Sequence, residues 1–247
     1  MLDTGLNKYR GTRIIKQLTF EELTPIVLRS KKRKRTLSLR IDDGGRVIVQ
    51  VPYRTPEKDV TAFVRSRQAW IEKNLALYRQ HSRECGGPRR FASGDTFLYL
   101  GDTYPLEICE RNEGQPLTLA HGIFRLDRSS HEKARELFVK WYARRAKETI
   151  AERVDHYRRQ LGFLPIEVRI TGAQSRYGSC SADNRLSFSW RLIMAPYPVI
   201  DYVIMHEIAH IKHKNHSKRF WDFVEQMAPD YRKHRQWLNE NNHLLVL

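Results

Sequence analysis

The pattern of hydrophobic and polar positions predicts a hairpin and a helix near the start of the chain. Hydrophobic residues alternate in residues 37–41 and again in residues 47–51, on both sides of the turn sequence DDGG. Thr55, followed by a proline, offers a helix start, and apolar residues recur at helical spacing from Val60 to Tyr78. We expect one hairpin followed by one amphipathic helix.

A polar segment separates this region from the rest of the chain. Residues 79–94 contain Gly86-Gly87-Pro88 and show no hydrophobic period, so we expect a linker or a long loop there. The sequence therefore predicts two parts: residues 1–90, a hairpin and helix region, and residues 91–247.

The second part combines short strands with longer helices. The predicted strands cover residues 96–100, 103–108, 117–126, 166–170 and 186–190. The predicted helices cover residues 131–161 and 199–211, a segment from Ser217 to Pro229, and a last one from Asp230 to about residue 238. This mixture predicts an α+β fold with a β-rich N-terminal part.

Composition adds a strong positive charge to this picture. The 247 residues include 44 lysines and arginines against 28 acids, which gives a net charge of +16, and 40% hydrophobic residues suffice for a core. Such a chain is attracted to polyanions, although a solvated basic surface has the same composition. The run from Lys31 to Arg35 has the same two interpretations, phosphate contacts or a solvated face.

Cysteines and apolar runs bear on the compartment. Cys85, Cys109 and Cys180 are an odd number without a close pair, which favours a reducing compartment over a disulfide framework. The N-terminus lacks a continuous apolar segment, and no stretch is long enough to span a bilayer. We expect a cytoplasmic protein that does not enter a membrane.

The sequence His206-Glu207-Ile208-Ala209-His210 carries the candidate chemistry. Residues four apart in a helix lie one turn above each other, so both imidazoles can bind one metal ion, with Glu207 beside them. Zinc lowers the pKa of a bound water toward about 7, and the carboxylate can accept its proton during attack on a carbonyl. The apolar surroundings favour a metal over three independently satisfied polar groups.

A catalytic zinc needs a third protein ligand, and His216 is the first candidate. Asn215 could adopt the left-handed conformation that ends the helix and turns His216 back toward the metal. His213 lies two turns, or about 10 Å, from His206, which is too far for a shared ion. Glu225 or Asp230 from the next helix remains an alternative carboxylate ligand.

Upstream, the segment from Ser175 to Ser181 is small, polar and turn-like. It could place Arg176 or Tyr177 near the oxyanion that develops during hydrolysis, or it could be an ordinary tight turn. The strand that contains Leu186 and Phe188 could lie beside the metal helix and pair with an extended peptide, or could simply pack in the core.

With these motifs in view, the chain resembles the YgjP-like metallopeptidases, a zincin family similar to the SprT-like and WLM-type proteases. The resemblance covers roughly residues 30–245 and rests on KRTLSLRI at 34–41, RYGSCS at 176–181, WRLIMAP at 190–196 and HEIAHIKHKNHSKRFW at 206–221. It implies a gluzincin- or metzincin-like catalytic core with zinc on His206, His210 and His216, and with Glu207 as general base.

Two positions depart from the related patterns. The family usually has tryptophan where this chain has Tyr177, and the helix-breaking glycine of the metzincins is replaced by His213. Substrate expectations from metzincins therefore do not transfer.

The resulting prediction is a Zn²⁺-dependent peptidase that acts on peptides or proteins, with Arg176 as an oxyanion contact. The alternative is a nucleic-acid-associated binding or adaptor protein with a structural metal. The two can combine, because the basic surface would suit nucleic acid in either case.

Overall fold

The protein is described by a computed structural model. It describes residues 13–17, 25–31, 33–41, 45–84, 90–111, 114–164, 166–174 and 176–247. The chain divides into two compact units, residues 1–83 and 84–247, which are taken in turn. In the described part of the chain, no helix combines the length and the apolar character that a membrane span requires.

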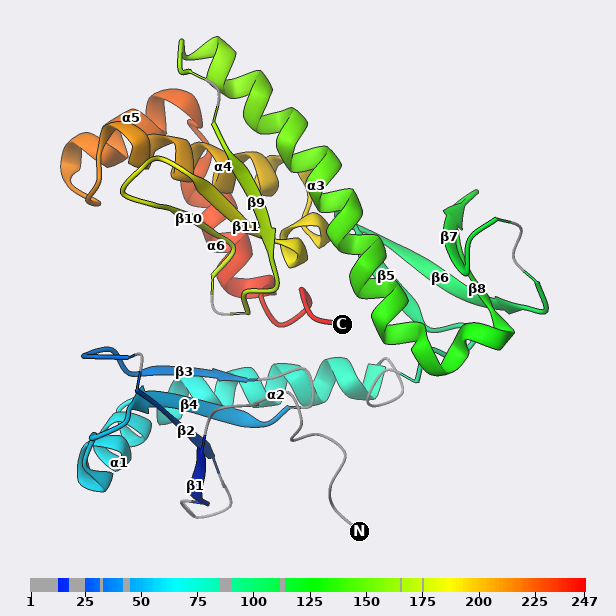
Figure 1. The fold of residues 1–247 in the computed structure, drawn as a ribbon, viewed down its shortest axis with the longest axis horizontal. Helices are drawn as coiled ribbons and strands as arrows, with labels where there is room; N and C mark the ends of the chain where they lie inside the picture. The colour runs from blue at the N-terminus through cyan, green and yellow to red at the C-terminus, as the bar shows by residue number, and fades with distance from the viewer. Residues whose placement is uncertain are drawn as a thin grey trace. The chain divides into compact units, whose positions relative to one another are not determined.

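The N-terminal unit is a four-stranded sheet with two helices (Figure 1). The strands are β1 (Arg13–Gln17), β2 (Ile26–Ser30), β3 (Ser38–Ile41) and β4 (Val47–Pro52), in the order β1-β2-β4-β3. The predicted hairpin strands β3 and β4 are antiparallel, whereas β2, which the sequence analysis missed, pairs with β4 in parallel. Valines of β2 and β4 form the core together with apolar residues of the helices.

The single helix predicted after Thr55 is wrong, because two helices occupy that stretch. They are α1 (Glu57–Arg65), which Pro56 precedes, and α2 (Gln68–Glu84). At the break, the Ser66 hydroxyl donates to the Phe63 carbonyl over 2.7 Å, which competes with the helical pattern. Because α2 extends to Glu84, the first part of the expected linker is helical; residues 85–89 lie outside the described residues.

The C-terminal unit begins with a second four-stranded sheet. Its strands are β5 (Thr96–Tyr99), β6 (Asp102–Cys109), β7 (Leu117–Ala120) and β8 (Ile123–Asp127), in the order β5-β6-β8-β7. The strand expected at 117–126 is two strands, because His121 and Gly122 turn the chain with φ angles of 51° and 77°. This is the turn geometry that matches the twist of a hairpin.

One long helix joins this sheet to the rest of the unit. After the 3₁₀ helix η2 (Arg128–Lys133), α3 (Ala134–Gln160) runs from the sheet to the loop before β9 (Figure 1). Phe138 of α3 stacks on Phe97 of β5 with ring centroids 4.1 Å apart, and both are fully buried. Further along α3, the guanidinium of Arg153 binds the carboxylate of Asp201. The helix therefore ties the sheet to the elements that follow.

The remaining elements form a small sheet and three helices. They are β9 (Val168–Thr171), β10 (Gly178–Cys180), β11 (Leu186–Ser189), the 3₁₀ helix η3 (Trp190–Met194), α4 (Tyr197–Lys212), α5 (Lys218–Met227) and α6 (Tyr231–Asn241). The sheet order is β10-β11-β9. Helix α4 contacts α3, α5, α6 and β10, so its apolar surface is buried on most sides. The predicted α+β class is confirmed.

The structure excludes one of the two alternatives that the sequence left open at each of two places in this small sheet. β11 is its middle strand, with β10 on one side and β9 on the other, so neither edge of β11 is open to an extended peptide. Within the described residues, β10 is the strand at the edge that contacts α4. The segment expected as a turn thus contains this edge strand.

Candidate metal centre

Helix α4 holds three of the predicted site residues. It begins after Pro196, and its apolar residues Val203, Ile204 and Ile208 are buried in the core of the unit. Glu207 is 6% exposed, whereas His206 and His210 are partly exposed. The helix therefore presents two imidazoles at its surface and keeps a carboxylate inside.

The loop after α4 brings His216 back to the helix. The predicted left-handed turn at Asn215 is wrong, because positive φ angles are absent from this loop; instead His213 ends the helix with an extended backbone. The ammonium of Lys214 donates to the Ser181 carbonyl over 3.3 Å and to the Asn184 side chain, which anchors the loop to the β10–β11 connection. The loop therefore turns back without a left-handed residue, and Lys214 connects it to the β10–β11 connection.

The three histidines meet at their Nε2 atoms. The Nε2 atom of His216 lies 3.1 Å from that of His206 and 3.2 Å from that of His210. All three candidate ligand atoms lie within 4.8 Å of one another. Two Zn–N bonds of about 2.0–2.1 Å at a tetrahedral angle separate their nitrogens by about 3.3 Å. This is close to the two distances measured from Nε2 of His216.

Hydrogen bonding alone explains this cluster poorly. A neutral imidazole nitrogen carries either one N–H or one lone pair in the ring plane, so His216 Nε2 cannot form two well-directed hydrogen bonds. A cation that accepts three lone pairs satisfies all three atoms together. The donor set therefore fits a metal ion of the kind that imidazole prefers.

Other contacts fix the tautomer and the rings. Nδ1 of His210 lies 3.1 Å from the His213 carbonyl, to which it can donate, leaving the Nε2 lone pair free for a metal. The fully buried Phe220 ring lies 4.9, 4.5 and 4.8 Å from the rings of His206, His210 and His216. Phe220 thus forms a common floor under the three imidazoles. Nδ1 of His206 is buried without a partner among the described residues.

Burial favours the neutral form of His206 and His210. It lowers the pKa of His206 to about 3, with smaller contributions from the charges of His210, His216 and Arg235. Burial also lowers the pKa of His210, although the His213 carbonyl partly offsets it. Neutral imidazole is the form that binds a metal.

Burial has the opposite effect on the carboxyl group of Glu207. It raises the pKa of Glu207 to about 7, and the positive charge of Arg176 reduces the increase. A carboxyl group with a pKa near 7 can both accept and release a proton at neutral pH.

A glycine gives Glu207 its space, and the sequence analysis did not single it out. A Cβ atom on Gly178 of β10 would lie 2.5 Å from Oε1 and 2.6 Å from Cγ of Glu207. Any side chain at position 178 would therefore displace the carboxylate. The glycine is visible in the sequence RYGSC at residues 176–180, but the sequence alone does not reveal that this glycine lies against Glu207.

The other candidates lie at different places. Arg176 is exposed, and its charge acts on Glu207, whereas Tyr177 packs against the core and burial raises its pKa. The His213 ring packs against Phe223, and Glu225 forms an ion pair of 2.9 Å with Arg232.

Asp230 precedes α6. Among the described residues, the histidine cluster includes neither of the two carboxylates that were considered as ligands, Glu225 and Asp230.

Comparisons with known proteins identify the family. No curated protein matches the chain. A crystal structure of the metallopeptidase zymogen of Pyrococcus abyssi abylysin is similar with 21% identity and a TM-score of 0.34, covering 37% of this chain and 93% of that one. The model of the family described as YgjP-like, metallopeptidase domain, matches residues 35–241, which is most of the chain. The chain therefore belongs to the YgjP-like metallopeptidase family.

Proposed function

We propose that the protein is a zinc-dependent peptidase whose metal is held by His206, His210 and His216. The observation that carries this proposal is the convergence of three imidazole nitrogens beside a buried carboxylate. Three protein ligands leave one position of a tetrahedral zinc open, as hydrolysis requires. In this interpretation residues 91–247 contain a zincin-like catalytic domain, and α4 is its active-site helix.

The chain's own residues then perform the proton transfers. Bound zinc supplies Lewis acidity, which polarises a peptide carbonyl and acidifies water. Glu207 accepts the proton of the attacking water at a carboxylate oxygen and passes it to the leaving amine. Burial raises the pKa of Glu207 to about 7 without a metal, and the positive charge of bound zinc would lower it, which favours the carboxylate form that accepts the proton. Gly178 leaves the space that this carboxylate occupies, because any Cβ there would overlap it.

Arg176 is the proposed contact for the oxyanion. Its side chain is exposed two residues before Gly178, which adjoins the Glu207 carboxylate, and its positive charge acts on Glu207. A guanidinium there would stabilise negative charge that develops on the carbonyl oxygen.

Metal quantification together with a peptide-library digest tests the proposal. We expect one zinc per chain in both wild type and Glu207→Gln, and cleavage by wild type alone. Glutamine keeps the shape of the side chain but cannot accept the proton. A protein without stoichiometric zinc, or a Glu207→Gln variant that cleaves as fast as wild type, would exclude this function.

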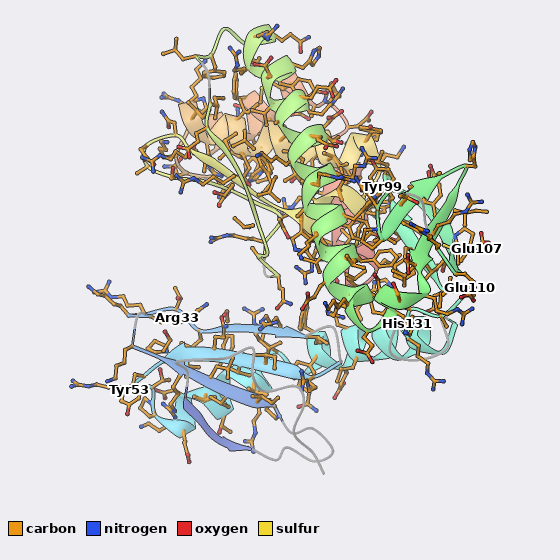
Figure 2. The ribbon with its side chains drawn as sticks, turned by 45° about the vertical axis from the view of Figure 1, so that its right-hand side comes forward. Arg33, Tyr53, Tyr99, Glu107, Glu110 and His131 are labelled. Atoms are coloured by element: carbon orange, nitrogen blue, oxygen red, sulfur yellow. The ribbon has the colours of Figure 1, made fainter. Side chains whose placement is uncertain are left out.

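The N-terminal unit supports a second function, binding of nucleic acid. Residues 1–83 contain 19 lysines and arginines and 8 acids, a net charge of 19 minus 8, or +11, out of +16 for the whole chain. Figure 2 shows Arg33 and Tyr53 on this unit, and the Lys31 ammonium lies 5.5 Å from the centroid of the exposed Tyr53 ring. A cation beside an exposed aromatic ring suits a phosphate backbone with unpaired bases.

Salt dependence tests this second function. Binding of labelled single-stranded DNA, followed by fluorescence anisotropy, should weaken steeply between about 50 and 200 mM salt because phosphate contacts release counterions. Tyr53→Ala should weaken binding without changing that slope. An affinity that hardly changes over this range would contradict the phosphate contacts.

A further inference from the structure

Helix α6 places a guanidinium near the histidine cluster. The guanidinium carbon of Arg235 lies 5.2 Å from the centroid of the Trp221 ring. The Trp221 ring in turn stacks on the His216 ring, with centroids 5.7 Å apart and an interplanar angle of 26°, and lies 5.7 Å from the His206 ring. A positive charge thus lies one aromatic ring away from two of the three imidazoles.

Arg235 is exposed, and no carboxylate in the described part of the chain forms an ion pair with it. The same helix provides a contrast. Arg232, one turn earlier, also lies over an aromatic ring, 5.0 Å from the centroid of Tyr231, but its charge is paired with Glu225 at 2.9 Å. Of these two stacked guanidiniums, one is neutralised within the protein and the other is available to a ligand.

We propose that Arg235, held on Trp221, forms an anion-binding subsite beside the metal centre. This subsite binds a carboxylate of the peptide substrate. Stacking on an indole orients a guanidinium. The N–H groups, which lie in the plane of the guanidinium, stay free for bidentate binding of a carboxylate. The carboxylate belongs to an acidic side chain or to the peptide's C-terminus. This inference rests on the proposed peptidase function, of which it names the substrate class.

Peptide binding to zinc-loaded Glu207→Gln tests the subsite without turnover. Three fluorescein-labelled peptides of equal length are compared at about 0.15 M salt. The first is glutamate-rich with blocked ends, the second has glutamine at each glutamate, and the third is this glutamine peptide with a free C-terminal carboxylate.

The subsite predicts about tenfold to hundredfold tighter binding of one of the carboxylate peptides over the blocked glutamine peptide, the range of a charge-assisted hydrogen bond. The carboxylate peptide that binds more tightly shows whether the carboxylate comes from a side chain or from the C-terminus. Equal affinity for all three peptides would overturn the subsite.

Variants of α6 separate the subsite from general electrostatic attraction. In the Glu207→Gln background, Arg235→Gln should abolish the preference and Arg235→Glu should reverse it. Arg232→Gln removes the same formal charge from the same helix and should keep the preference. Persistence of the preference in Arg235→Gln, or equal loss in Arg232→Gln, would overturn the assignment to Arg235.

Both arginines are exposed, so the variants should fold, which their thermal unfolding checks. The outcome for the subsite is also separate from that for the peptidase. Binding is measured with an inactive variant, so an absence of hydrolysis by wild type would exclude the peptidase and leave the binding result readable. Hydrolysis without any carboxylate preference would exclude the subsite alone.

Discussion

Replacing Gly178 with alanine would put a methyl group into space that the Glu207 side chain occupies. The new Cβ would lie 2.5 Å from Oε1, whereas ordinary van der Waals contact begins at 3.4 Å. The carboxylate oxygen must therefore retreat by about 0.9 Å, the difference between these distances. A misplacement of about 1 Å at a reacting group can cost about 10²-fold in rate, or about 2.7 kcal/mol of transition-state stabilisation.

We expect Gly178→Ala to lower kcat about 10²-fold while zinc stays bound. The clash concerns Glu207 and not the imidazoles, so zinc stoichiometry should remain that of wild type. Gly172→Ala is the matched control, because a Cβ there would have Trp190 Nε1 as its nearest neighbour, at 3.9 Å. Steady-state kinetics on one peptide and metal analysis of each variant give the comparison.

A double variant shows whether the effect acts through Glu207. If Gly178 serves only to position this carboxylate, adding Gly178→Ala to Glu207→Gln should change neither the zinc stoichiometry nor any trace of residual hydrolysis. Wild-type kcat in Gly178→Ala would refute the reasoning. So would loss of zinc in that variant, because the damage would then extend beyond the carboxylate.

Three further outcomes follow from the geometry of the site. His216→Ala should weaken zinc binding by more than the roughly 10–100-fold that loss of a hydrogen-bond partner of a ligand costs, whereas His213→Ala should not. Titration against a chromophoric chelator measures both affinities. Equal effects of the two variants would argue against His216 as a ligand. Phe220→Ala removes the floor under the imidazoles and should cost about 3–5 kcal/mol of stability in urea unfolding as well as weaken zinc binding; unchanged zinc affinity would count against the floor. In metal-free protein, the pKa of Glu207 is raised to about 7, so its contribution to the free energy of unfolding is lost as pH rises from 4.5 through 7. The pKa of His206 is lowered to about 3, so its contribution is lost as pH falls from 6.5 toward 3. When pH is lowered from 7 to 5, the free energy of unfolding in urea should therefore fall by up to about 2 kcal/mol relative to wild type in Glu207→Gln, and rise by up to about 2 kcal/mol in His206→Gln. Changes of the same sign in the two variants would contradict this.

Local patterns predicted much of the fold because they depend on neighbours in sequence. Alternation located the strands β3, β4 and β11, and helical spacing located α3 and α4. The break at Ser66 was missed because a single hydroxyl competes with the helix there without disturbing the apolar spacing. The order of β10, β11 and β9 was beyond the sequence because pairing joins distant segments.

The same division holds for the candidate metal centre. The sequence alone determined that His206 and His210 share one face of a helix with Glu207 beside them, because a spacing of four residues fixes that geometry within the helix itself. Only the tertiary structure decided that His216 joins them and that Gly178 leaves room for the carboxylate. Those placements depend on how a loop folds back and how a strand packs on a helix, and these are set by long-range contacts.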